Sequence, residues 1–138
     1  MSQARIRQTF ETALYDNFST VYDILPYSTK STPNPNNITL RPRLLPSTTN
    51  TLTLSGDHKV FTGLFQVGVC TPLGMGAGAA DEVVEALQAL YPTDSEWTHP
   101  TDLSFEVQVI SPISVLNSEA EDSFFYTPVR FSYRADTN

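Results

Sequence analysis

A glycine-rich turn contains residues of the kind that bind phosphate. Gly74-Met75-Gly76-Ala77-Gly78 stands between a strand-like and a helix-like segment, where phosphate-binding loops occur. The spacing differs, because the dinucleotide pattern needs a third glycine three residues after the second, and the mononucleotide pattern needs Gly-Lys-Ser/Thr. Asp81, Glu82 and Glu85 would also oppose a phosphate at the helix start. We interpret the turn as flexible or as a subunit contact, with nucleotide binding as the minor alternative.

The only cysteine, Cys70, is a candidate nucleophile with His58 or His99 as its base, since a thiolate needs such a neighbour at neutral pH. It ends a strand-like segment, however, where a small buried thiol is the ordinary occupant. The two histidines have no second His or Cys at metal-ligand spacing. The sequence therefore predicts no metal and no cofactor, and a packing role for Cys70. A single cysteine also fits a reducing cytoplasm.

Trp97 lies in a polar stretch that we expect to be a loop, Pro92–Thr101. Aromatic residues on the surface are enriched at protein interfaces, which makes Trp97 a candidate contact residue. The alternative is that its indole covers one end of the core.

Charge is distributed unevenly along the 138 residues, which are the length of one domain, 1–138. The net charge is −7; residues 1–70 carry six basic and four acidic groups, and residues 71–138 carry two basic and eleven acidic groups. Binding to nucleic acid relies on several Lys and Arg contacts with phosphates, so this balance disfavours a DNA-gripping protein. We expect no membrane-spanning segment, because no apolar run approaches the roughly 20 residues required.

The elements that must position these residues follow from hydrophobic spacing. Helices are predicted over residues 4–18 and from about Ala80 to Tyr91, where Pro92 ends the second. Apolar and polar residues alternate in four strand-like segments, namely 37–45, 59–70, 103–109 and 128–134. Residues 27–37, 46–50 and the acidic 117–122 segment are expected to be polar loops, and Pro42 assigns its strand to a sheet edge or a bulge.

These elements predict an α+β fold in the order α-β-β-α-β-β. Each strand offers one apolar face and each helix one apolar stripe. The simplest arrangement is a four-stranded, mainly antiparallel sheet with both helices packed on one face and long polar loops.

Four stretches, in this order, resemble the tail terminator proteins of long-tailed bacteriophages. They are Ile38-Thr-Leu-Arg-Pro-Arg-Leu-Leu-Pro46, Thr62-Gly-Leu-Phe-Gln-Val67, the Gly74–Gly78 turn with its alanine-rich helix, and Pro128-Val-Arg-Phe-Ser-Tyr133. Each stretch is unspecific alone, and the weight lies in their order, spacing and total length. The chain departs from the family pattern in its long Ser/Thr/Pro/Asn loops.

The resemblance implies a structural virion protein without enzymatic activity. Six copies would form a ring that caps the tail tube, stops its polymerisation and provides the head-tail joining interface. Its partners would be further copies of the chain, the major tail-tube protein and head-completion or connector proteins, with DNA passing through the lumen without specific binding. It would assemble in the host cytoplasm and reside in the tail or neck of the virion, with no membrane partner.

For contacts with subunits and partners, we predict three regions: residues 27–37, residues 46–58, and the glycine-rich turn with the following helix start. A ring assembled head to tail needs two different complementary surfaces, which the basic and acidic halves could supply. The candidate residues are Lys30, Arg41, Arg43, Asp57, His58, Gly74, Met75, Gly76, Asp81, Glu82 and Trp97. Arg41 and Arg43 are the best candidates to pair with acidic residues of a neighbour; the alternative is that they only protect an edge strand from aggregation.

Three other readings stay open. The chain could be a head-completion or connector protein of the same neck, which shares ring symmetry but binds the portal. It could be a small enzyme that uses Cys70 or the glycine-rich turn, or a structural module of a non-viral machine.

Overall fold

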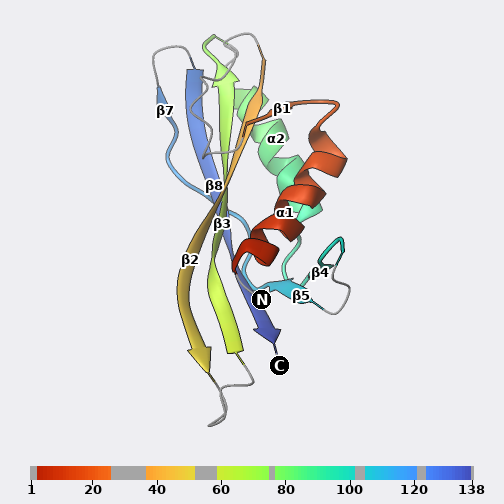
Figure 1. Cartoon of the computed structure of the whole chain (residues 1–138). Coiled ribbons are helices and arrows are strands. Elements are labelled where there is room, and N and C mark those ends of the chain that lie inside the picture. Colours follow the sequence, from red (N-terminus) through yellow and green to blue (C-terminus); the bar gives the residue numbers. More distant parts are fainter. Residues whose placement is uncertain are drawn as a thin grey trace.

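In the part of the chain that the structure describes, one mixed sheet carries two helices on a single side (Figure 1). The computed structural model describes residues 3–25, 37–51, 59–74, 77–101, 105–120 and 124–137. The α+β class and the placement of both helices on one face agree with the sequence prediction. The predicted loop 27–37 lies almost wholly outside the described residues.

Helix α1 spans Gln3–Phe18, as the periodicity predicts. Its apolar stripe is fully buried at Ile6, Phe10 and Leu14, which recur at intervals of four residues and so share one face. The amides of Val21 and Tyr22 both donate to the carbonyl of Phe18, and this turn ends the helix. The apolar side of α1 thus packs against the sheet.

Helix α2 spans Ala77–Leu90 and also agrees with the prediction. Val83, Val84 and Leu87 are buried, while the residues between them face outward. Pro92 cannot continue the helix. Within the described residues, no helix is long and apolar enough to cross a membrane.

Three long strands form the centre of the sheet: β2 (Thr39–Thr51), β3 (Lys59–Pro72) and β8 (Phe124–Thr137). β3 pairs with β8 antiparallel without any register shift, from Lys59 opposite Thr137 to Pro72 opposite Phe124. Both β2 and β8 are longer than the sequence predicts. Cross-strand pairing extends β2 into the polar residues 46–51 and extends β8 into residues 124–127 and 135–137, which hydrophobic alternation does not mark.

The predicted loop at 46–50 is wrong, because β2 continues through it. β2 pairs with β3 from Thr39 opposite Cys70 to Thr51 opposite Lys59, and the register shifts once, between Pro46 and Thr49. A bulge inserts one extra residue and lets the ladder resume beyond it. The strand therefore tolerates a proline and several polar residues without ending.

One edge of the described sheet is formed by β2 itself over most of its length. The short strand β1 (Asp23–Ile24) lies parallel to β2 but pairs only with Thr39 and Leu40, which makes the sheet mixed. Beyond Leu40, β2 has no described strand on its outer side. Pro42 thus lies in an edge segment, as predicted, where it costs no ladder hydrogen bond to a further strand.

The other edge of β8 is covered by three strands in succession. These are β5 (Glu106–Val109), β6 (Ser114–Val115) and β7 (Glu119–Ala120), and β4 (Glu96–Thr98) pairs with β5 outside them. Among the described residues, the sheet therefore has eight strands and not four. β4 and β7 lie in segments predicted to be loops, because two- and three-residue pairings leave no periodic signal in a sequence.

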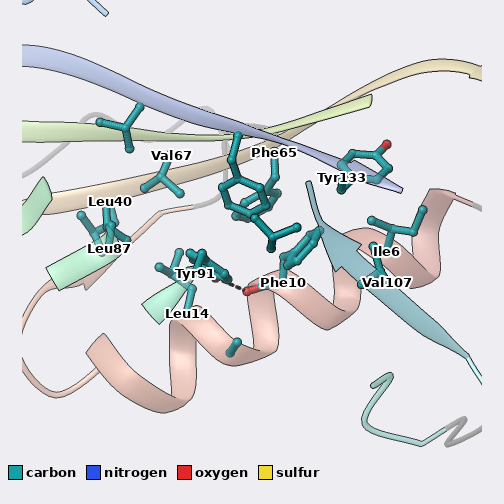
Figure 2. Packing of buried hydrophobic residues seen from close by; sticks show 14 of the residues in the cluster. Ile6, Phe10, Leu14, Leu40, Phe65, Val67, Leu87, Tyr91, Val107 and Tyr133 are labelled. Carbon is teal, nitrogen blue, oxygen red and sulfur yellow. Dashed lines mark hydrogen bonds between the residues drawn. The ribbon is translucent and has the colours of Figure 1, made fainter. Parts of the chain in front are cut away.

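Four aromatic rings form the centre of the core between the layers, and Figure 2 labels three of them, Phe10, Phe65 and Tyr91. Phe10 of α1, Phe65 of β3, Tyr91 after α2 and Phe131 of β8 all lie within 6.0 Å of one another, measured between ring centroids. Tilted and edge-to-face pairs at such distances add to the free energy of burial. This cluster fixes both helices against the same region of the sheet.

Candidate subunit-contact surfaces

The sheet has an exposed face on the side away from the helices, and four arginines lie on it. Side chains alternate between the two faces along each strand. Phe65, Val67 and Val69 are buried and point toward the helices, as do the residues paired with them on β2 and β8. The residues next to them in each strand point away from the helices. By this alternation and the strand register, the outward residues include Arg41, Arg43, Arg130 and Arg134. We call this surface the arginine face.

Two of these arginines flank a single glutamine. Arg43 of β2 is opposite Gln66 of β3, and Gln66 is opposite Arg130 of β8, so the three form one row across the sheet. With strands about 4.8 Å apart, the two arginine backbones stand roughly 10 Å apart. Gln66 Nε2 donates to the hydroxyl of Tyr126, 3.4 Å away. Gln66 thus lies between two arginine positions and forms a hydrogen bond with an aromatic hydroxyl.

The arginine face also contains apolar surface. Leu45 and Leu64 are opposite each other in the row next to Gln66, and both are half-buried. On the other side of that row, the ring of Tyr126 covers Gly68, where a Cβ atom would overlap the ring. Arginine, tyrosine and leucine side chains are thus intermixed, a composition that suits a protein contact.

Acidic groups also lie on this face. By the register, Glu106 and Glu96 point the same way as Arg134, and Glu119 points the same way as Tyr126. Along β2, β3 and β8 the only acidic residue is Asp136, which pairs with Arg134: Nε donates to Oδ1 at 2.8 Å and a second guanidinium nitrogen donates to Oδ2 at 3.1 Å. The hydrogen bond and the charge of Asp136 raise the pKa of Arg134. The arginines of this face are therefore accompanied by carboxylates, and the face is mixed in charge.

The opposite side of the molecule is acidic at α2. Asp81, Glu82 and Glu85 are exposed on that helix, which contains no lysine or arginine. Helix α1 differs, because its Arg7 and Glu11 form an i,i+4 pair at 3.8 Å. Burial raises the pKa of Glu11, and the charge of Arg7 partly opposes this increase. The negative surface of the helix layer is therefore concentrated on α2.

A mostly apolar hollow of about 260 Å³ lies between α2 and the adjoining end of the sheet. Its lining comes from α2, β3, β8 and the short strands on β8, namely Thr71, Ala80, Asp81, Val84, Val115, Ser118, Phe125 and Thr127. Val115 and Phe125 are 51% and 37% exposed, which is high for large apolar residues beside a cavity. The acidic surface of α2 is thus bordered by apolar surface.

The structure brings some of the predicted contact residues into these surfaces and leaves others undescribed. Arg41 and Arg43 lie on the arginine face, and Asp81 and Glu82 lie on the exposed side of α2. Gly74 is exposed at the end of β3 with φ of 93°, a backbone conformation that favours glycine. Lys30, Asp57, His58, Met75 and Gly76 lie outside the described residues.

Trp97 contacts the core more than the two surfaces described above. It lies on β4, is half-buried, and packs its ring 5.5 Å from that of Tyr91. Its Nε1 donates to the Ser95 hydroxyl at 3.1 Å. This placement favours the alternative in which the indole covers one end of the core.

Cys70 and His99 do not form a nucleophile and base. Val69 points toward the helices, so Cys70 points to the opposite side of the sheet, where it is fully buried. His99 is fixed on the helix side, with Nε2 2.7 Å from Gln8 Oε1 and Nδ1 accepting from the amide of Thr101. The residues described contain no group of three or more His, Cys, Asp or Glu side chains arranged to hold a metal ion.

Sequence reasoning missed Arg130 and Arg134, although a signal was present. The arginines of residues 41–43 and 128–134 occupy the polar positions of two alternating strands. If both strands belong to one sheet with one buried face, those positions share the other face. The hollow was not predictable in this way, because the strands that complete it carry no alternation.

The fold and its surfaces describe a two-layer α+β protein whose chemistry differs between its two exposed sides. The sequence matches the family described as phage tail terminator protein over residues 5–133. A solved structure with 30% sequence identity superimposes with a TM-score of 0.77, over 98% of this chain and 96% of that one. A search among curated proteins finds no match. The chain belongs to the phage tail terminator family and is thus a structural protein of a phage tail.

Proposed function

We propose that this chain closes the end of the phage tail tube as a ring of identical subunits, six in number, and thereby stops tube polymerisation. Family membership over residues 5–133 is the observation that carries the proposal. The opposite face of the ring would meet head-completion or connector proteins and join the tail to the head. DNA would pass through the lumen without specific contacts.

The surfaces support a ring of this kind. A subunit that binds the next one head to tail needs two different, complementary patches, because a twofold contact uses the same patch twice and stops at a dimer. The outer face of the sheet and the exposed side of α2 are two different surfaces on opposite layers. Continued head-to-tail contact closes into a ring when the rotation between subunits permits.

The direct experiment mixes the purified chain with tail-tube subunits from the same phage. We expect negative-stain images of tubes capped at one end and fixed in length, and a mass of the isolated cap that equals six subunits. Tubes that keep growing in the presence of folded protein would contradict the proposal.

Loss of the gene separates this function from a head-completion role in the same neck. A missing terminator gives overlong tails, because polymerisation is not stopped. Normal tails beside separate heads would instead assign the chain to head completion.

A further inference from the structure

We propose that the hollow beside α2 binds one large apolar side chain of a different tail protein, on a segment where a Lys or Arg stands next to that side chain. The inference deepens the proposed function, because it assigns part of each subunit's surface to a partner of the ring. Three properties of the hollow define the occupant, namely its size, its apolar wall and the charge around it.

The size of the hollow suits a single side chain. Its volume of about 260 Å³ is below the range of about 300–1,000 Å³ that is usual for small-molecule pockets. It opens at the surface between α2 and the short strands on β8, where a side chain of another protein can enter.

The wall of the hollow favours an apolar group. Val84 of α2 is buried beside it, and Val115 and Phe125 stay partly exposed at its edge. The Ser118 and Thr127 hydroxyls form a hydrogen bond with each other at 2.7 Å, so neither needs a polar group from a ligand. An apolar side chain that enters therefore removes Val115 and Phe125 from water and leaves that hydroxyl pair intact.

The surface around the hollow is negative. Asp81 lines it, and Glu85 follows one turn later on the same side of α2; both are exposed. The segment from Val60 to Val129 supplies the described lining, and it contains ten acidic residues and no Lys or Arg. An apolar side chain with a neighbouring cation is therefore favoured here over one with a neighbouring carboxylate.

A second copy of this chain lacks such a segment among its described residues. Large apolar side chains exposed away from the hollow, none of them next to a Lys or Arg in the sequence, are Tyr15, Val21, Leu73 and Ile110. Ile110 lies near Arg134, but the guanidinium of Arg134 already pairs with Asp136. Membership of a tail-protein family places other tail proteins beside this chain, and we assign the hollow to one of them.

A charge reversal at the hollow tests the electrostatic part of the inference in the full-length chain. D81K places a cation in the lining, so it should weaken binding of the partner at least about tenfold. D16K is the matched control, because it makes the same substitution at an exposed position of α1 outside the described lining. Binding by D16K should stay within about twofold of the unmodified protein.

A second pair of variants tests the apolar part. Val115 borders the hollow, whereas Val21 is exposed in the turn after α1. V115D introduces a carboxylate where the apolar side chain should pack, and we expect binding to fall at least about tenfold. V21D makes the same change away from the hollow and should bind normally.

Binding is measured by biolayer interferometry with two purified probes, the tail-tube protein and the head-completion protein of the same phage. We expect one of them to bind, and its affinity to follow the two pairs of variants. Overlapping peptides that cover the sequence of that probe then identify the segment, which should contain a Leu, Ile, Phe or Met next to a Lys or Arg. Circular dichroism and urea titration establish that each variant is folded, and sedimentation reports its self-association.

Several outcomes would overturn the inference while the capping role stands. Equal binding by folded D81K and D16K would place the contact elsewhere, and this pair decides the matter even if V115D fails to fold. A binding segment without a cation beside its apolar residue would reject the proposed chemistry. Loss of self-association in D81K, with both probes bound normally, would show that the occupant is a second copy.

The failure of the proposed function has a different signature. If the affinity of a probe follows the variants but tubes grow past the unmodified protein, the hollow binds its partner and only the capping role is wrong. If neither probe binds the unmodified protein, either free or at tube ends, the inference is wrong, and the length of the tubes then decides separately on the capping role.

Discussion

The hydroxyl of Tyr91 donates a hydrogen bond to the backbone carbonyl of Phe10, 2.7 Å away, and so joins the end of α2 to the middle of α1 (Figure 2). Tyr91 is 1% exposed, and its ring belongs to the four-ring cluster. The two helices thus meet the sheet as a fixed pair. This relationship matters for the surfaces, because α2 carries the acidic side and α1 anchors it.

Replacement of Tyr91 by phenylalanine tests that link. The ring packing is kept and one buried hydrogen bond is lost, so Y91F should lower the free energy of unfolding by about 1 kcal/mol. Urea denaturation followed by circular dichroism measures the change. Y15F is the matched control, because Tyr15 is 38% exposed on α1 and its loss of a hydroxyl should change stability little. Equal effects of the two substitutions would contradict the buried link.

Alanine at Gly63 should destabilise the sheet, because its Cβ has no room. A Cβ there would lie 2.5 Å from the Tyr133 hydroxyl oxygen and 2.6 Å from the carbonyl oxygen of Leu45, which belongs to the backbone. We expect G63A to cost about 1–3 kcal/mol, the range for overpacking.

The chain supplies its own control for that substitution. Gly78 is exposed in the first turn of α2, and a Cβ there meets nothing within 4 Å. G78A should therefore raise stability by roughly 0.4–1 kcal/mol. Thermal unfolding of the two variants measures both changes, and a stabilised G63A would show that β2 and β3 are not in this register.

Cys70 should be inert toward thiol reagents while the protein is folded. Its side chain is fully buried in β3, so reaction with an aromatic disulfide reagent should follow unfolding and be rapid only in urea. An exposed thiol introduced as S19C in a C70S background gives the reference rate, since Ser19 is exposed after α1. If Cys70 reacts as fast as that reference, a catalytic role for the thiol would need consideration again.

Hydrophobic spacing predicts those parts of the fold in which one face of an element is buried. Ile6, Phe10 and Leu14 in α1, and Val83, Val84 and Leu87 in α2, mark the helices within a few residues of their true ends. Phe65, Val67 and Val69 identify β3 in the same way. In each case the signal exists because burial against the other layer imposes it.

The remaining strands form for reasons that a sequence does not display. β4, β6 and β7 have two or three residues each, and their pairing depends on where β5 and β8 have already been placed. The bulge after Pro46 likewise reflects a ladder imposed by β3. Tertiary context, not local propensity, determines these elements.

Only some of the arginines on the arginine face could be predicted from the sequence, for a related reason. Arg41 and Arg43 stand out beside a proline in an edge-like strand. Arg130 joins them only when Gln66 is placed opposite both Arg43 and Arg130, which is knowledge of register. A one-residue shift of either pairing would have moved that arginine to the opposite face.

Alkaline pH should destabilise the protein through its buried tyrosines. Burial raises the pKa of Tyr133 to about 12, above the ordinary value of 10.0, and raises that of Tyr91 still further. A group with a raised folded-state pKa contributes stability that is fully present below the unfolded value and is lost as pH rises through the folded one. The free energy of unfolding should therefore fall between pH 10 and pH 12.

Y133F removes one of the two titrating groups and should make that decrease shallower, without abolishing it, because Tyr91 remains. The variant also loses the hydrogen bond that the Tyr133 hydroxyl donates to Gln3 Oε1 at 2.5 Å, so its stability at neutral pH should be lower by about 1 kcal/mol. Urea titrations at neutral pH and at several alkaline values separate the two effects. An unchanged slope in Y133F would show that Tyr133 titrates as if exposed, and would place the start of α1 away from β8.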